Sequence, residues 1–150
     1  MHYCNSNPSY VIEDNLHKTV VKCTQVQAYT SGLWYYAEYQ SFKLDSEANY
    51  YRLHVSGYSG DAGDSLANTT LDIKEQHNGM KFSTPDSDND IQFVASCAVT
   101  FNASWWFASC MHSCLTCSYG SNIFSWFSLH TYGLESIGKL RAAQMKIRRV

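Results

Sequence analysis

The chain has 150 residues, which is enough for one domain with a buried core. Hydrophobic residues make up 45% of the sequence and charged residues only 16%, which argues against a disordered chain. The net charge of −2 gives no overall signal for binding nucleic acid, and no run of 18 apolar residues predicts a membrane-spanning helix.

Strands are predicted where β-branched residues gather or apolar residues alternate, at 19–28, 35–44, 51–55, 97–100 and 145–150. Glycine, serine and aspartate predict turns at 56–63 and 83–90. A spacing of three residues between Leu134, Ile137 and Leu140 predicts a short helix within 134–144. Residues 1–33 show little regular pattern apart from the strand predicted at 19–28.

Six cysteines are many for an intracellular protein of this length and indicate disulfides and secretion. They allow 15 connectivities, so the pairing of Cys4, Cys23, Cys114 and Cys117 stays open. Asn68 and Asn102 begin glycosylation sequons, which agrees with a secreted glycoprotein. The first residues have neither the basic nor the apolar region of a signal peptide.

An acidic run, Asp86-Ser87-Asp88-Asn89-Asp90, places alternate carboxylates in a polar loop. Ca²⁺ takes six to eight oxygen ligands, including backbone carbonyls, and would relieve repulsion between these charges. An EF-hand is excluded because Ile91 and Cys97 occupy the positions that need glycine and glutamate. A solvated turn is the alternative to a calcium site.

Two further motifs have chemical interpretations. Cys110, His112, Cys114 and Cys117 could together hold Zn²⁺, although disulfides would use the same thiols. Gly63-Asp64-Ser65-Leu66 matches the nucleophile block of a hydrolase class that carries those letters. Such an enzyme needs a histidine base with an aspartate three residues before it, and of the six histidines only His17, with Asp14, has that spacing.

Several segments, taken in order, resemble fibrinogen-related domains. They are Tyr50 to Leu66, His77 to Thr84, the acidic run, Cys97-Ala98-Val99, Trp105-Trp106, Cys110, and Met145 to Arg148. The resemblance covers about residues 34–150 and implies an α+β fold of the fibrinogen C-terminal type. That fold has a twisted antiparallel sheet and a loop-rich calcium and ligand subdomain. The family's N-terminal subdomain is not recognisable in residues 1–33. The resemblance therefore implies a divergent N-terminal segment at 1–33 and a partial fibrinogen C-terminal-like domain at 34–150 that lacks this subdomain.

The resemblance implies a structural Ca²⁺ ion in the acidic loop. Asp88 and Asp90 would supply carboxylates, and Gln92 and Val94 would supply carbonyl oxygens. It also implies a disulfide between Cys97 and Cys110.

In the ficolin-like and tachylectin-like lectins of this family, an acetyl group binds beside that disulfide. The resemblance implies a cis bond between Ser109 and Cys110, with the N–H groups of Cys110 and Met111 as donors. Aromatic walls would come from Phe101, Tyr119 and Tyr132. Met111 stands where the family usually has histidine, and Leu115-Thr116-Cys117 replaces a Leu-Asn-Gly turn. Both departures fall near the pocket.

The sequence therefore predicts a secreted, calcium-stabilised, non-enzymatic domain that binds acetylated carbohydrates or glycoproteins in innate immunity, as a monomer or a homo-oligomer. An adhesion or extracellular-matrix module that binds protein without sugar is the alternative. A hydrolase that uses Ser65 is a third hypothesis.

Overall fold

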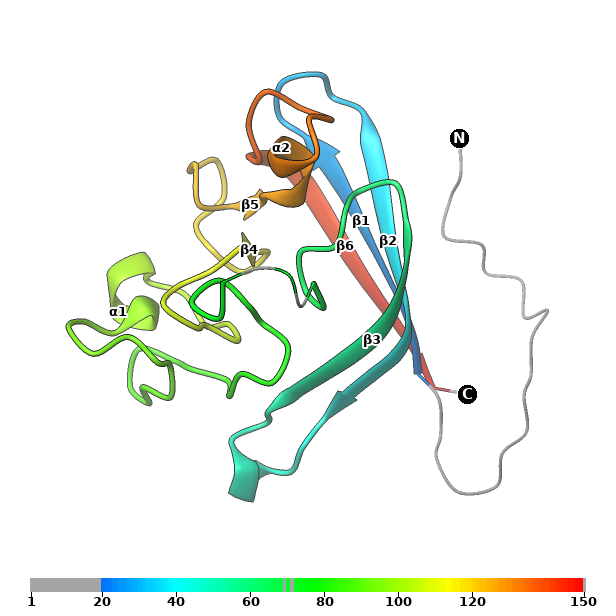
Figure 1. The fold of residues 1–150 in the computed structure, drawn as a ribbon. Helices are drawn as coiled ribbons and strands as arrows, with labels where there is room; N and C mark the ends of the chain where they lie inside the picture. The colour runs from blue at the N-terminus through cyan, green and yellow to red at the C-terminus, as the bar shows by residue number, and fades with distance from the viewer. Residues whose placement is uncertain (1–19, 69, 71, 150) are drawn as a thin grey trace.

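A four-stranded antiparallel sheet organises the molecule (Figure 1). The computed structural model describes residues 20–68, 70 and 72–149. The strand order is β3-β2-β1-β6, so the last strand pairs with the first. The strands are β1 (Val20–Ala28), β2 (Trp34–Leu44), β3 (Leu53–Gly60) and β6 (Leu140–Arg149).

The two central strands confirm the sequence predictions at 19–28 and 35–44, as far as the structure describes them. Strand β1 pairs with β2 on one side and with β6 on the other. Residues 20–28, which the sequence assigned to the divergent segment, therefore lie inside the same sheet as 34–44. The predicted closing strand at 145–150 is confirmed within β6.

Strand β3 is longer than predicted, and the turn prediction for 56–60 is wrong. The strand continues to Gly60, which pairs with Ala37 of β2. Gly57 and Gly60 have positive φ angles of 72° and 141°. A Cβ atom at Gly60 would collide with the backbone of Tyr36. These glycines, which suggested a turn, instead permit an irregular strand close to its neighbour.

Residues 97–100 form a helix rather than the predicted strand. Helix α1 (Cys97–Phe101) begins after Ser96, whose side chain accepts a hydrogen bond from the Val99 N–H. It ends at Asn102, which is left-handed with φ 48° and donates its N–H to carbonyl oxygens of α1. Local capping therefore outweighs the β-branched content of this short segment.

The helix predicted within 134–144 is also wrong. Leu140 starts strand β6, and Leu134 and Ile137 lie exposed in the loop before it. Of the three residues spaced by three, Leu134 and Ile137 are exposed and Leu140 is buried in a strand. They therefore do not form one buried face of a helix.

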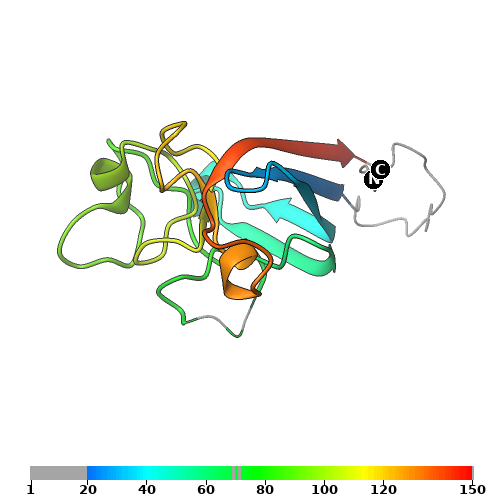
Figure 2. The ribbon, with the colours of Figure 1, turned by 90° about the horizontal axis from the view of Figure 1, so that it is seen from above.

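The loop-rich part of the molecule packs against one face of the sheet. It contains two short strands and two short helices, α1 and α2 (Ser128–Thr131), whereas a 3₁₀ turn lies in the connection between β2 and β3. Figure 2 shows α1 at the end away from the strands. The elements not yet named are η1 (Glu47–Asn49), β4 (Ser113–Cys114) and β5 (Ser125–Trp126).

The core lies between the loops and the sheet. Its largest fully buried side chains include Trp105, Trp126, Tyr39 and Phe107. This arrangement confirms the predicted α+β class with an antiparallel sheet. Within the described residues, no helix is long and apolar enough to cross a membrane.

Candidate functional site

A disulfide between Cys97 and Cys110 joins helix α1 to the chain that follows the buried tryptophans. The Cα atoms are 5.6 Å apart, and the predicted pairing is confirmed. Cys114 and Cys117 pair with each other, and Cys23 is also disulfide-bonded. The zinc interpretation is wrong, because Cys110, Cys114 and Cys117 have no thiolate to offer a metal.

The peptide bond between Ser109 and Cys110 is cis, as the resemblance implied. The Ser109 N–H donates to the Lys74 carbonyl oxygen over 2.7 Å, and the Ala108 N–H donates to the Cys110 carbonyl oxygen over 2.7 Å. Among the residues that the structure describes, no oxygen accepts from the N–H of Cys110 or of Met111. Both residues are partly exposed. Within the described residues these two successive backbone donors thus have no acceptor, and we call them open in this sense.

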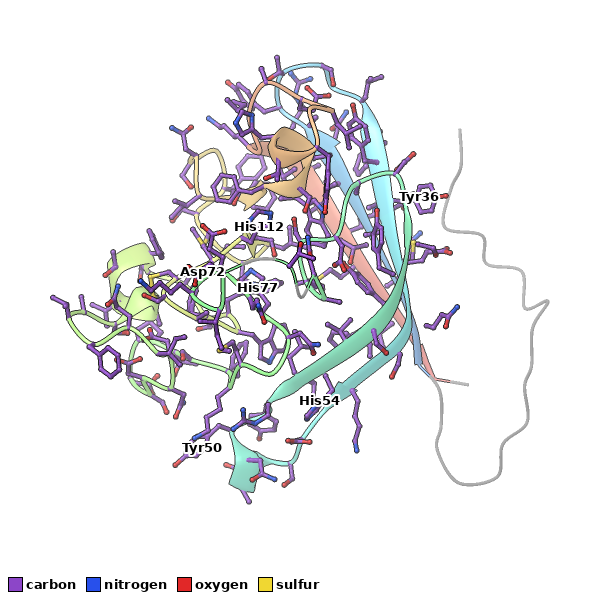
Figure 3. The ribbon with its side chains drawn as sticks, in the orientation of Figure 1. Tyr36, Tyr50, His54, Asp72, His77 and His112 are labelled. Carbon is purple, nitrogen blue, oxygen red and sulfur yellow. A yellow bond between two sulfur atoms is a disulfide. The ribbon has the colours of Figure 1, made fainter. Side chains whose placement is uncertain are left out.

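The next two N–H groups, those of His112 and Ser113, both donate to Nε2 of His77, over 3.0 Å and 2.9 Å. Nδ1 of His77 lies 2.8 Å from the Trp106 carbonyl oxygen. Since Nε2 accepts two bonds, Nδ1 carries the proton and donates to Trp106. Figure 3 shows His77 in the interior, beneath His112. His77 therefore fixes the chain on the C-terminal side of the two open donors.

Burial lowers the pKa of His77 to about 4, although the Trp106 carbonyl oxygen acts in the opposite direction. The sequence assigned this residue no role. Its only signal was its place in the segment His77 to Thr84 that resembles the family.

His112 lies beside the same loop and is also buried. Its Nδ1 is 3.6 Å from a carboxylate oxygen of Glu75, and its ring lies against Phe127. Burial lowers the pKa of His112 more than Glu75 raises it. Its Nε2 has no hydrogen-bond partner within the described residues.

One of the three predicted aromatic walls lies on the disulfide-bonded segment. Phe101 is at the end of α1, with its ring centroid 6.2 Å from that of Phe107. Tyr119 instead packs on Phe124, 5.7 Å between centroids. The hydroxyl of Tyr132 accepts from the Asn68 side chain over 3.0 Å. In the described part of the chain, neither tyrosine has a hydrogen bond or ring contact with residues 97–111.

The acidic loop is tied to the same disulfide through Asp90. Its carboxylate accepts from the N–H of Gln92 and from the N–H of Cys97, each over 2.8 Å. Its pKa is raised mainly by burial and further by the neighbouring Asp88, while the two N–H groups lower it. Asp88 itself accepts from the Asp90 N–H over 3.3 Å. The carboxylates of Asp88 and Asp90 thus lie close together. No cationic side chain contributes to the pKa of Asp90 among the causes of its change.

The two residues predicted to supply carbonyl oxygens are accessible to solvent. Val94 is exposed, and Gln92 is partly exposed. Within the described residues, no three His, Cys, Asp or Glu side chains gather as a metal group. A cation here would therefore need carbonyl and water oxygens besides the two carboxylates, as Ca²⁺ accepts.

Comparison with known proteins identifies the family of this chain. The model of the fibrinogen beta and gamma chains, C-terminal globular domain, matches residues 12–149. The chain belongs to this family. Human fibrinogen-like protein 1 is 36% identical over 124 residues, covering 75% of this chain and 38% of that protein. A techylectin-like protein of Phoneutria nigriventer is 40% identical over 84 residues, covering 56% and 34%.

The fibrinogen-like globe domain of human ANGPTL6 has a similar structure, with a TM-score of 0.67 and 29% identity. The match covers 89% of this chain and 58% of that chain. The chain thus spans well under two thirds of these relatives. Fibrinogen C-terminal domains are recognition modules, and this chain is a non-enzymatic member.

Ser65, the serine of the hydrolase-like motif, belongs to the interior of this fibrinogen C-terminal domain. Ser65 is buried, and its hydroxyl donates to the Ser128 hydroxyl over 2.6 Å. The same oxygen accepts from the Ser128 N–H over 3.1 Å. In the described residues no imidazole bonds to Ser65, so no base is placed to activate it.

Proposed function

We propose that this domain is a secreted lectin that binds acetylated sugars through the backbone N–H groups of Cys110 and Met111. The single observation that carries the proposal is that these two donors are open while the following two are held by His77. An acetyl carbonyl oxygen can accept from both donors, and Phe101 offers an apolar wall for the acetyl methyl. The similarity to a techylectin-like protein supports a lectin.

The histidine that the family usually has after the second cysteine of the disulfide is absent, because Met111 stands there. His112 does not replace it at the surface, since it is buried against Glu75 and Phe127. Binding would therefore depend on backbone donors and shape, without a surface imidazole next to Cys110.

Replacing Phe101 by alanine should weaken the affinity for N-acetylglucosamine about fivefold, because burying a methyl-sized group contributes about 0.8–1 kcal/mol. Titration calorimetry with N-acetylglucosamine, and with glucose as the unacetylated control, measures the effect. The matched variant is Phe93→Ala, which removes the same ring from a fully exposed position. Equal loss in both variants, or equal binding of both sugars, contradicts an acetyl pocket at Phe101.

We further propose that Asp88 and Asp90 bind a structural Ca²⁺ ion, with the carbonyl oxygens of Gln92 and Val94. The residues fit such an ion in two respects. The raised pKa of Asp90 reflects burial and a neighbouring like charge, both of which a cation would counter. The loop also exposes the residues whose carbonyl oxygens would complete an oxygen shell. Because Asp90 bonds to the Cys97 N–H, the ion would stiffen the disulfide-bonded segment.

Calcium at ten times its dissociation constant should raise the free energy of unfolding by about 1.4 kcal/mol. The double variant Asp88→Asn with Asp90→Asn should lose this gain, since amides keep the hydrogen-bonding shape without the charge. Denaturant unfolding with calcium and with chelator measures it. Asp86→Asn is the control, because Asp86 lies in the same loop but bonds to Thr84. A double variant that gains as much as the wild type refutes the site.

A protein-adhesion module is the second candidate, and one observation favours it. Phe93 and Val94 are almost fully exposed in the loop between the acidic run and α1. Such apolar side chains commonly mark a contact with another protein. The calorimetric titration also separates the candidates, since the adhesion module predicts no binding of N-acetylglucosamine to a folded, calcium-treated sample.

A further inference from the structure

A second exposed apolar surface lies at one end of the sheet, apart from the disulfide site. It is formed where the turn between β1 and β2 meets the loop before β6, and Figure 1 shows both at the same end of the sheet. The Tyr29 N–H donates to the Lys139 carbonyl oxygen over 3.1 Å, and the Thr30 and Ser136 hydroxyls are 3.4 Å apart. The Ser31 hydroxyl donates to Glu135. Two segments that are 100 residues apart in sequence thus form one surface.

We name this surface the turn patch, and its apolar members are all more than 40% exposed. Their exposed fractions range from 41% for Leu134 to 58% for Leu33. The apolar members of the turn patch are Tyr29, Leu33, Trp34, Leu134 and Ile137. Single exposed apolar residues are ordinary, but five at the β1–β2 turn, the start of β2 and the loop before β6 indicate a contact surface.

Two cations border the turn patch. The Lys139 ammonium lies 4.1 Å from the ring centroid of Tyr29, and the Arg141 guanidinium lies 6.0 Å from the same centroid. Arg141 also donates to the Tyr29 carbonyl oxygen over 3.4 Å. Tyr29 thus holds both cations next to the apolar side chains.

Among the described residues, no carboxylate forms a salt bridge with Lys139 or Arg141. Glu135 is buried and accepts from Ser31 and from the Tyr35 hydroxyl. Asp61 accepts from the Tyr36 N–H beyond the end of β3, at the opposite margin of the sheet from β6. The charges that border the apolar side chains are therefore positive.

We propose that the turn patch attaches the domain peripherally to lipid bilayers that carry anionic headgroups. Exposed Leu33 and Ile137 would enter the boundary between headgroups and acyl chains, and Trp34 and Tyr29 would lie at headgroup level. Lys139 and Arg141 would face the phosphates. An anionic glycan would use the cations but gain nothing from the aliphatic side chains. A symmetric second copy would bring the two cations of each chain towards those of the other.

Co-sedimentation with vesicles tests the proposal in the presence of a calcium chelator, so that the acidic loop does not contribute. We expect saturable binding to phosphatidylcholine vesicles that contain phosphatidylserine, and at least tenfold weaker binding to phosphatidylcholine alone. The double variant Lys139→Gln with Arg141→Gln should bind about 25-fold more weakly, because each cation near an anionic surface contributes about a factor of five. Leu33→Ser with Ile137→Ser should lose binding as well.

The chain offers matched controls on the other end of β6. Lys146→Gln and Ile147→Ser change exposed residues of the same kinds at a distance from the turn patch, and both should bind like the wild type. Thermal unfolding of each variant verifies that it is folded at the assay temperature.

Tryptophan fluorescence supplies an independent readout. Of the four tryptophans, Trp105, Trp106 and Trp126 are buried and Trp34 is exposed. Brominated lipids should therefore quench the emission of Trp34 selectively, and Trp34→Phe should abolish the quenching.

Three results would overturn the proposal. They are absence of binding to anionic vesicles, binding that both double variants retain, and binding without quenching of Trp34. A dimer in sedimentation velocity that Leu33→Ser with Ile137→Ser dissociates, without vesicle binding, would assign the turn patch to a second copy. Heparin binding that only the charge variant loses, without vesicle binding, would assign it to an anionic glycan.

Discussion

Replacing His77 by alanine should lower the free energy of unfolding by about 3–5 kcal/mol. The variant would leave the Trp106 carbonyl oxygen and the N–H groups of His112 and Ser113 without their partner in the interior. Each buried polar group that loses its partner costs about 1–3 kcal/mol, and a water molecule in the new cavity would recover part of that cost. Loss of ring contacts with Trp105 adds to the effect.

Denaturant unfolding measures the change, with His130→Ala as the control. His130 is exposed at the end of α2, so its loss should change the free energy of unfolding by less than about 0.5 kcal/mol. Hydrogen exchange gives a local readout, because the amides of His112 and Ser113 should lose protection in His77→Ala. A loss of stability below about 1 kcal/mol would contradict the role of His77 as the anchor of this loop.

The sheet could largely be predicted from the sequence, because strands that contact a core on one face carry a visible alternation. Tyr35, Ala37 and Tyr39 of β2 illustrate this, and the prediction for 35–44 is confirmed. The register and the pairing of β6 with β1 could not be predicted, since they join residues more than 100 positions apart. Such pairing depends on the whole fold rather than on local pattern.

The errors share a physical cause, which is that short segments carry too little local information. At 97–100 the capping residues Ser96 and Asn102 decide for a helix, although Val99 and Thr100 favour a strand. At 56–60 pairing with β2 outweighs the preference of glycine for turns.

The candidate site was predictable only where the resemblance supplied it. Spacing alone left 15 cysteine pairings open, whereas the family implied the observed bond between Cys97 and Cys110. Cys114 and Cys117 have no family counterpart, so their pairing could not be predicted. The structure shows that they bond to each other. The role of His77 depends on Trp106 and His112, which are distant in sequence, so no local motif could reveal it.

Acidification from about pH 6.5 to about pH 4 should lower the stability of the domain through His77. The imidazole has a pKa of 6.5 in the unfolded chain, and burial lowers it to about 4 in the folded protein. Between these values the unfolded chain binds more protons, so protonation favours unfolding. Each pH unit in this window costs up to about 1.4 kcal/mol, which sums to about 3 kcal/mol. Above about pH 7 both states are neutral and the contribution of His77 does not change.

Other groups titrate nearby, so the contribution of His77 has to be isolated by comparison. The lowered pKa of His112 acts in the same direction, and the raised pKa of Asp90 acts in the opposite one.

The variant His77→Gln cannot take up a proton at this position, so its stability should fall less steeply with acid than that of the wild type. Denaturant unfolding at about pH 7 and about pH 4.5 gives both slopes, and His130→Gln should keep the wild-type slope. Because the neutral imidazole holds the N–H groups of His112 and Ser113, the same protonation should release the chain beside the open donors of Cys110 and Met111. Equal slopes in wild type and His77→Gln would show that the acid sensitivity arises elsewhere.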